Sequence, residues 1–421
     1  MTLLIIETLG AILLALVVGQ TFIFFASSVR RLLHQRTVEK LSYDLLCEQL
    51  QTARGLRKKT EGDAAPWNGI RKFSVQKKVM ETRDICSFYL EPHDRKPLPS
   101  FFPGQYLTFE LRIPGQKNRT VRCYSLSDGP LPDVYRISIK RQGPPPGKEG
   151  VQPGLVSNYF HTEIKEGDIV DVKAPAGHFF LDPAEAGGVV LVAGGIGVTP
   201  MLSILNTLVR MRSTREVHFF YGLRNRSEHA MKDHLEKVAR ENPNVHLHVC
   251  YSQPGEGEQA GQDYHHAGRV SVDLFKQVLP SNNYDFYICG PGPFMESITT
   301  GLSEWGVPDK NVHFEAFGPS SVKKVADVSG AAQAAGQTFS IEFKKSGRKL
   351  SWGSGCTNIL QLAMDNDIAI PCGCRAGSCG TCQVAVFSGE VGYVTPSDFA
   401  TERGTRLTCI GAPKSDVVLD A

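Results

Sequence analysis

A large excess of charge of one sign is absent from this sequence of 421 residues. Lys and Arg number 46 against 43 Asp and Glu, which gives a formal net charge of +3. Dedicated nucleic-acid-binding proteins are usually far more basic, so we expect no nucleic-acid partner. Apolar residues make up 41% of the chain and charged residues 21%, a composition that excludes wholesale disorder. The length suits roughly two to four domains.

Paired C-x2-C units, which are typical of structural zinc sites, are also absent. The 11 cysteines are an odd number in a chain much longer than a small secreted domain, which argues against a disulfide framework. Near the C-terminus, Cys374, Cys379 and Cys382 follow the pattern C-x4-C-x2-C, and Cys409 is a distant fourth cysteine. This is the plant-type 2Fe–2S spacing, so we predict these four thiolates as the cluster ligands. Cys372 is an extra thiol, and a set in which it replaces Cys374 has the wrong spacing.

Charged residues are missing from Thr8 to Val29, a run of 22 residues. A helix of this length would span a hydrocarbon core of about 30 Å, so we predict a transmembrane anchor in 1–29. A cleaved signal peptide would need a basic start, which is absent, and a buried core helix is the other alternative. The arginines that follow at 30, 31 and 36 predict a single-pass protein of the cytoplasmic membrane, with its folded domains on the cytoplasmic side.

Residues 30–59 carry eight Lys and Arg against three Asp and Glu. We expect a basic helix next to the membrane, followed by a short linker that ends at residue 69. Attraction to anionic lipid headgroups and a merely solvated charged helix both explain this composition, and the sequence leaves the choice open.

Two kinds of strand pattern follow. Apolar and polar residues alternate in part over 103–111 and 134–141, as in strands of an antiparallel barrel. From residue 187, continuous apolar runs alternate with helical stretches, which predicts a parallel sheet covered on both faces. Small polar residues over 319–336 indicate a linker before a separate C-terminal unit.

The motif RCYSLSD contains the residue types that a flavin requires. Arg122 can pair with a pyrophosphate, Tyr124 offers a flat ring to the isoalloxazine, and Ser125 can hydrogen-bond a ring nitrogen. Further along, GLVSNYFH places Gly154 and Ser157 at an expected helix start, where an anion can bind. An ordinary helix cap is the alternative for this second motif.

The fingerprint G-x-G-x-x-G is absent, so a simple Rossmann assignment fails. The segment VLVAGGIGVTPM instead places Gly194, Gly195 and Gly197 between an apolar strand and a helix, where a backbone can approach a pyrophosphate. In YICGPGPFM, a strand ends at Cys289, where α/β sheets bind ligands, and we expect Cys289 near the nicotinamide. A purely structural turn and an inert buried cysteine are the alternatives.

The order of these motifs, completed by FEAFG, resembles the ferredoxin–NADP reductase superfamily and especially the reductase half of flavohaemoglobins. With the C-terminal cysteine motif, the chain also resembles reductase components of bacterial oxygenases. The resemblance implies three domains: an FAD-binding β-barrel (70–182), an α/β NAD(P)-binding domain (183–318) and a β-grasp 2Fe–2S ferredoxin domain (337–421).

The resemblance also implies roles for single residues. The residues implied to contact FAD are Arg122, Tyr124, Ser125, Gly154, Val156, Ser157 and Phe317, with Glu315 beside Phe317. Those implied to contact NADH or NADPH are Gly195, Thr199 and Cys289, and the two glycine-rich motifs above add Gly194, Gly197, Gly290 and Pro291 to the nucleotide site. Ser125, Cys289, Glu315 and Phe317 are the implied catalytic group. Arg224 and Arg226 follow a strand near the expected adenosine ribose, where an arginine can accept a 2′-phosphate; the flavohaemoglobin likeness nevertheless favours NADH.

The implied function is a membrane-anchored NAD(P)H-dependent reductase. Electrons would pass as a hydride to FAD, then singly to the 2Fe–2S cluster, and then to a partner oxygenase, hydroxylase or desaturase. A respiratory-type NADH:quinone oxidoreductase and a non-catalytic scaffold that carries a cluster are the alternatives.

Overall fold

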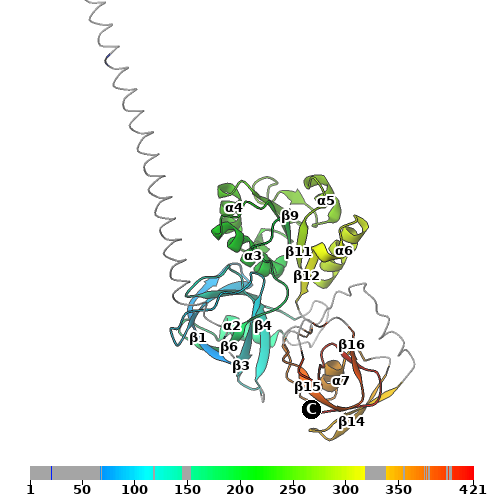
Figure 1. Ribbon diagram of the computed structural model, residues 1–421. Helices are drawn as coiled ribbons and strands as arrows, with labels where there is room; N and C mark the ends of the chain where they lie inside the picture. The colour runs from blue at the N-terminus through cyan, green and yellow to red at the C-terminus, as the bar shows by residue number, and fades with distance from the viewer. Residues whose placement is uncertain are drawn as a thin grey trace, which may run out of the picture. The chain divides into compact units, whose positions relative to one another are not determined.

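The computed structural model describes Gln20, Trp67, 69–116, 119–144, 153–317, 338–353, 356–373, 375, 377, 380–394, 397 and 401–421. The predicted basic helix and the 319–336 linker lie outside these residues, as do Cys374 and Cys379. The described chain forms three sheets of five or six strands and a small two-stranded sheet (Figure 1).

The prediction of a transmembrane helix is wrong for the part of the chain that the structure describes. No helix there is both long enough and apolar enough to cross a membrane. The helices α3 (Val198–Arg210) and α6 (Gly292–Glu304) have 13 residues each, and such a helix extends only about 20 Å against a hydrocarbon core of about 30 Å. The same finding overturns the predicted location in a membrane. The run 8–29 itself lies outside the described residues except for Gln20.

The first sheet is an antiparallel barrel of six strands in the order β4-β3-β6-β1-β2-β5. An isolated bridge between Leu126 and Ile137 brings the chain after β4 beside β5 and so joins the two edges. Phe73, Phe88 and Phe109 are fully buried inside with Phe160 of the single helix. The elements are β1 (Arg71–Met80), β2 (Ile85–Pro92), β3 (Tyr106–Leu111), β4 (Thr120–Ser125), β5 (Tyr135–Lys140), α2 (Leu155–Thr162) and β6 (Ile169–Ala176).

The second sheet has six strands in the order β10-β9-β8-β7-β11-β12, and all of its pairs are parallel. Alternate strand residues belong to two separate apolar cores: α3 and α4 contribute to one, and α5 and α6 to the other. The predicted parallel sheet is therefore confirmed. Its strands are β7 (Val189–Gly194), β8 (Val217–Leu223), β9 (Val245–Tyr251), β10 (His266–Ala267), β11 (Asp285–Gly290) and β12 (Val312–Ala316). Its helices are α3 (Val198–Arg210), α4 (Lys232–Glu241), α5 (Val272–Val278) and α6 (Gly292–Glu304), with 3-10 turns at Gly195–Gly197, Arg226–Glu228 and Asp309–Asn311.

The strand order of this sheet reverses between β7 and β11. From β7 the chain continues outward through β8 and β9, whereas β11 and β12 lie on the other side. The carboxyl ends of β7 and β11 therefore form a topological switch point, which is where ligands bind in open α/β sheets.

The third sheet is mixed, in the order β14-β13-β19-β15-β17, with β13 parallel to β19 and antiparallel to β14. Helix α7 buries Ile359, Leu360 and Ala363 in the same core as Ile341 and Phe343 of the sheet. This is the arrangement expected of a β-grasp unit. The elements are β13 (Phe339–Phe343), β14 (Arg348–Trp352), α7 (Ile359–Asp365), β15 (Gln383–Ser388), β16 (Val391–Tyr393), β17 (Thr405–Leu407), β18 (Gly411–Pro413) and β19 (Val417–Leu419).

Candidate functional site

The barrel and the parallel sheet meet at two strand ends. The Ser125 hydroxyl, at the end of β4, donates to Oε2 of Glu315 in β12 across 3.5 Å. Phe317 follows β12 and is 38% exposed, although it is a large apolar side chain. The structure thus brings together two predicted site residues that are 190 positions apart. An exposed aromatic ring beside them provides a flat surface for another ring.

Of the predicted flavin contacts in β4, Arg122 and Tyr124 lie on one face of the strand and are partly exposed, whereas Ser125 is buried. Arg122 is half-buried, and Nη1 donates to the carbonyl of Val121 at 2.7 Å. Among the described residues no ion pair of Arg122 is found, so its remaining N–H groups suit an anion such as a phosphate. The Tyr124 ring packs edge-on against Phe109 and Phe160, and burial raises the pKa of its hydroxyl. Tyr124 therefore keeps its proton at neutral pH.

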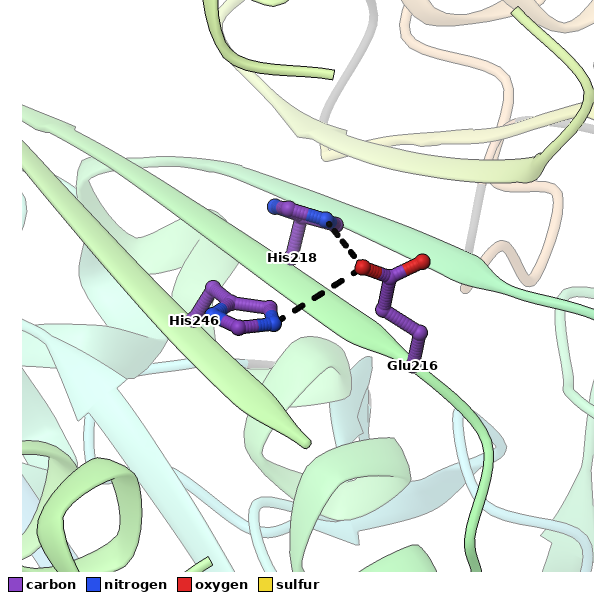
Figure 2. Close-up of side chains that lie close together, drawn as sticks. All are labelled: Glu216, His218 and His246. Atoms are coloured by element: carbon purple, nitrogen blue, oxygen red, sulfur yellow. Dashed lines mark ion pairs between the residues drawn. The ribbon is translucent and has the colours of Figure 1, made fainter. Parts of the chain in front are cut away.

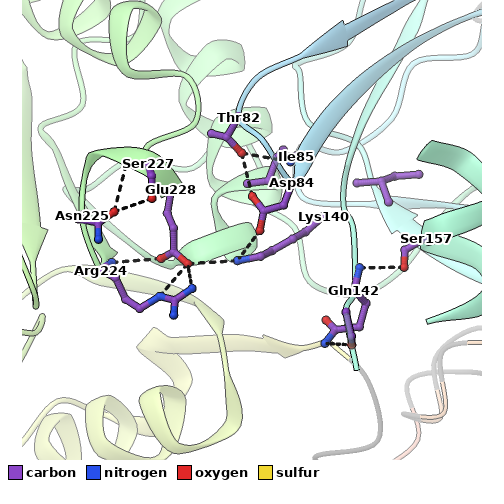
Figure 3. A network of polar contacts seen from close by, with 12 residues as sticks. Thr82, Asp84, Ile85, Lys140, Gln142, Ser157, Arg224, Asn225, Ser227 and Glu228 are labelled. Atoms are coloured by element: carbon purple, nitrogen blue, oxygen red, sulfur yellow. Dashed lines mark hydrogen bonds and ion pairs between the residues drawn. The ribbon is translucent and has the colours of Figure 1, made fainter. Parts of the chain in front are cut away.

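Helix α2 begins at Gly154, which provides no side-chain cap. A Cβ at Gly154 would lie 2.8 Å from Cβ of Gln142 and 2.9 Å from Oγ of Ser157, so only glycine fits. The Ser157 hydroxyl accepts from the backbone N–H of Gln142 at 3.1 Å (Figure 3). It donates to the carbonyl of Gly154 at 3.1 Å. The side chain of Val156 is part of the barrel core. Only the first-turn N–H groups are left for an anion, and these have no acceptor within the helix.

The three glycines after β7 differ in what surrounds them. A Cβ at Gly197 would lie 2.1 Å from the carbonyl oxygen of Cys289, and one at Gly194 would lie 3.1 Å from Phe294. Gly195 has a positive φ of 53°, and a Cβ there would meet nothing within 4 Å. Gly197 therefore lets the turn after β7 pack against β11, Gly194 lets β7 pack against the start of α6, and Gly195 alone of the three leaves its backbone open to a ligand. The Thr199 hydroxyl is buried and donates to Ile196, which fixes the turn.

The neighbouring strand β11 ends in a closely packed turn. Cys289 is fully buried, and burial together with Glu315 raises the pKa of its thiol well above the usual value. The thiol therefore stays protonated. A Cβ at Gly290 would lie 2.6 Å from the Phe294 ring, and Pro291 caps α6.

The two arginines after β8 are exposed, but each faces a carboxylate. The side chain of Arg224 is 67% exposed, and Nη2 lies 2.5 Å from Oε1 of Glu228. Arg226 Nη1 lies 3.5 Å from Asp263. Glu228 also contacts Lys140 of the barrel at 3.6 Å, so the pair belongs to a network between the two sheets (Figure 3). A 2′-phosphate would have to compete with these carboxylates for both arginines.

Asp128, the last residue of RCYSLSD, has a role that the sequence analysis missed. Its Oδ1 accepts from Asn206 at 2.8 Å and from Arg210 at 2.6 Å, both on α3. Burial alone would raise its pKa, but Arg136 and Arg210 outweigh burial and hold the pKa below its usual value. Asp128 therefore joins the barrel to α3 as a carboxylate. The sequence offered one signal for this role, namely an acidic residue at the end of the predicted flavin motif.

Two of the four predicted cluster cysteines are described. Cys382 precedes β15 and Cys409 follows β17, and these strands pair antiparallel. The N–H and the hydroxyl of Thr408 both donate to the carbonyl of Cys382, at 3.1 and 3.0 Å. Both cysteines are almost fully buried, beside Leu407 and Ile410. The fold therefore brings two soft sulfur donors to one apolar end of the strand pair, which fits an iron–sulfur cluster.

Among the described residues of the loop between Cys372 and Cys382, three have positive φ: Arg375 at 57°, Gly377 at 78° and Gly380 at 69°. A Cβ at Gly377 would lie 2.6 Å from Ile410. The left-handed turns expected for a loop that wraps a cluster are thus present in its described part. Cys372 is half-buried. Cys374 and Cys379 lie outside the described residues, so their places as ligands remain a prediction.

Three protein-family models match the chain. The oxidoreductase FAD-binding domain matches 72–181, the oxidoreductase NAD-binding domain 191–300, and the 2Fe-2S iron-sulfur cluster binding domain 341–414. A crystal structure of the FAD/NAD-binding domain of nitric oxide dioxygenase from Vibrio cholerae is 35% identical, with a TM-score of 0.53; the match covers 60% of this chain and 100% of that one. The chain belongs to the ferredoxin–NADP reductase superfamily.

Other members of this superfamily match different shares of the chain. A flavohemoprotein of Halalkalibacterium halodurans is 42% identical over 62% of this chain and 63% of its own length. One of Bacillus subtilis is 37% identical over 62% of each. The chain thus spans slightly under two thirds of the curated relatives that it matches. Phthalate dioxygenase reductase is 28% identical, with a TM-score of 0.52, and the match covers 84% of this chain and 98% of that one.

These matches confirm the predicted enzyme class and cofactors. The chain is an oxidoreductase with FAD-binding, NAD-binding and 2Fe–2S domains, similar to oxygenase reductase components. The domain boundaries and the role of each site residue remain predictions.

Proposed function

We propose that this chain is the reductase component of an oxygenase system, which takes electrons from NAD(P)H and passes them to a partner oxygenase, hydroxylase or desaturase. One observation carries the proposal: the likeness to phthalate dioxygenase reductase extends over 84% of this chain and 98% of that reductase. The flavohaemoprotein likeness covers 62% of the chain. Because the chain has a 2Fe–2S domain at 341–414, a reductase that passes electrons to a partner is a better proposal than a flavohaemoprotein-like function.

The barrel residues would hold FAD. Arg122 and the start of α2 at Gly154 offer N–H donors that suit the phosphates. Ser125 and Glu315, linked across the two sheets, would orient the isoalloxazine, and Phe317 would cover one of its faces. When bound, FAD accepts a hydride and releases electrons singly to an iron–sulfur cluster.

The switch point would hold the nicotinamide nucleotide. Gly195 would let the pyrophosphate approach the backbone, because it alone of the three glycines faces open space. Cys289 would limit how deeply the nicotinamide enters, as a neutral thiol at the end of β11. We propose NADH as the preferred donor, since Arg224 and Arg226 already face Glu228 and Asp263.

The cluster would be held by Cys374, Cys379, Cys382 and Cys409. Burial of Cys382 and Cys409 beside Leu407 and Ile410 would exclude water from its inner side. We propose the boundaries 70–182, 183–318 and 337–421 for the three domains, since each contains one of the sheets.

An anaerobic titration of the full chain tests the proposal. NADH and then NADPH would be added while visible absorbance follows the flavin and electron paramagnetic resonance follows the cluster. We expect both centres to be reduced, with NADH effective at the lower concentration. Turnover of a candidate oxygenase that depends on this chain would then support the partner. Reduction of quinone, with no candidate oxygenase accepting electrons, would contradict it.

A further inference from the structure

A cluster of histidines lies at the amino end of the parallel sheet, away from the switch point. Glu216 immediately precedes β8, His218 is the second residue of β8, and His246 is the second residue of β9. The strand register pairs His218 directly with His246. Since β8 has seven residues and its carboxyl end is at Leu223, the cluster and the nucleotide edge lie at opposite ends of the strand. The proposed electron-transfer function makes no use of these side chains.

The donor atoms of these three residues converge (Figure 2). Oε1 of Glu216 lies 3.3 Å from Nε2 of His218 and 3.7 Å from Nε2 of His246. All three donor atoms lie within 4.8 Å of one another. Two donors that each bind a tetrahedral Zn²⁺ at about 2.05 Å are about 3.4 Å apart. The separations of Oε1 from the two histidine nitrogens are therefore close to those around a bound ion.

A second observation points to a ligand. The side chain of His218 is only 6% exposed, and its Nε2 has no hydrogen-bond partner among the described residues. Oε1 of Glu216 forms an ion pair with that nitrogen at 3.3 Å, which is longer than a usual hydrogen bond. A metal ion between the two atoms would bind both the buried nitrogen and the carboxylate oxygen.

Two of the three donor residues, Glu216 and His218, also contact a neighbouring side chain through their second donor atom. The Tyr284 hydroxyl donates to Oε2 of Glu216 at 2.7 Å, which leaves Oε1 facing the histidines. Nδ1 of His218 lies 3.3 Å from Nε2 of His248. Histidines that bind metals commonly hydrogen-bond through their other ring nitrogen, and carboxylate ligands are likewise held by a second group. Ions can reach the site, because the side chains of Glu216 and His246 are each 43% exposed.

We propose that Glu216, His218 and His246 bind one divalent transition-metal ion of the zinc type, with water as the fourth ligand. Two imidazoles and one carboxylate are a known zinc donor set, whereas Mg²⁺ and Ca²⁺ prefer oxygen donors. The ion would fasten the start of β8 to the start of β9, at the edge of the sheet opposite the redox site.

Zinc uptake by the full chain with FAD and cluster in place tests the proposal. The protein would be dialysed anaerobically against a mild chelator and then against buffered ZnCl2, and zinc and iron would be counted by mass spectrometry. His246→Asn is the test variant because His246 is exposed, and His93→Asn, at an exposed histidine of the barrel, is the matched control. We expect one zinc per chain in the wild type and in His93→Asn, and binding weakened at least about 100-fold in His246→Asn.

Tyr284→Phe provides a graded second test. It removes the hydrogen bond to Glu216 while keeping the ring, and we expect zinc affinity about 10–100-fold weaker, as for other outer-shell changes. Equal zinc affinity in His246→Asn and wild type would overturn the proposal, because the zinc would then be bound elsewhere, for example by cysteines. Absence of zinc from the wild type at micromolar free zinc would overturn it as well.

Discussion

Nη2 of Arg210, on helix α3, lies 2.6 Å from Oδ1 of Asp128, at the end of the flavin motif of the barrel. Asn206 donates to the same oxygen, and the Ser203 hydroxyl donates to the carbonyl of Asp128 at 2.9 Å. One acidic residue therefore connects the barrel to three positions of the helix that begins at the nucleotide edge. In the proposed function these two sheets hold the flavin and the nicotinamide, and hydride transfer depends on the spacing of the two rings, so we expect the contact to have functional consequences.

We predict that Asp128→Asn destabilises the fold and slows reduction of the flavin by NADH. The substitution leaves the buried Arg136 without its carboxylate. Removing one partner of a buried pair costs about 3–5 kcal/mol, and we expect about 2 kcal/mol here because Arg210 is 40% exposed. Stopped-flow absorbance should show flavin reduction at least about tenfold slower. Asp133→Asn, at an exposed position of the same barrel, is the control and should change neither quantity. Unaltered kinetics in Asp128→Asn would show that the contact does not set ring spacing.

Gly195 and Gly197 should respond differently to alanine. Gly195→Ala places a methyl group in open space at positive φ, so we expect a stability loss of about 1 kcal/mol and a raised KM for NADH. Gly197→Ala drives a Cβ against the carbonyl of Cys289, so we expect a much larger fall in Tm. Thermal unfolding and steady-state kinetics of both variants check this. An unchanged KM in Gly195→Ala would remove that residue from the nucleotide site.

Arg122→Ala should lower the FAD content of the purified protein. The guanidinium has no ion pair among the described residues, so its expected partner is a phosphate. Absorbance at the flavin band, divided by protein concentration, measures the occupancy. Arg112→Ala, at an exposed residue just after β3, should retain full FAD. Equal occupancy in the two variants would exclude Arg122 from the phosphate site.

Cys379→Ser should remove or destabilise the cluster while flavin reduction by NADH continues. The matched variant Cys372→Ser should keep the cluster, because Cys372 stands outside the plant-type spacing. Iron content and electron paramagnetic resonance of the reduced proteins distinguish the two. Loss of iron in Cys372→Ser, with retention in Cys379→Ser, would reverse the ligand assignment.

Stability should fall with acid through His229. Burial lowers the pKa of His229 to about 4, and its Nδ1 lies 2.8 Å from the hydroxyl of Tyr251. The unfolded chain has a His pKa of about 6.5, so the unfolded state binds the proton first. The contribution of His229 to the free energy of unfolding is complete above about pH 6.5 and is lost as the pH falls from about 6.5 to about 4. The total loss is at most about 3 kcal/mol. Urea unfolding of His229→Asn between pH 7 and 5 should show a weaker pH dependence than wild type. A slope equal to that of wild type would show that His229 is not the titrating group.

Local patterns in the sequence predicted much of the fold. Alternation over 103–111 and 134–141 predicted β3 and β5, and the apolar runs predicted the parallel strands. The cluster spacing is likewise local, since three of its cysteines lie within nine residues. The membrane helix was different: it rested on hydropathy alone, and no described helix of the required length supports it.

The sequence by itself determined which cofactors this protein binds, because the residues of each motif are neighbours in the chain and their spacing directly reflects the chemistry. Only the tertiary structure decided that Gly195 alone of the three glycines faces open space, that Asp128 binds helix α3, and that His218 lies opposite His246. Those relationships join positions 28 to 100 residues apart. They depend on strand register and helix packing, which the whole core determines and no short window of sequence contains.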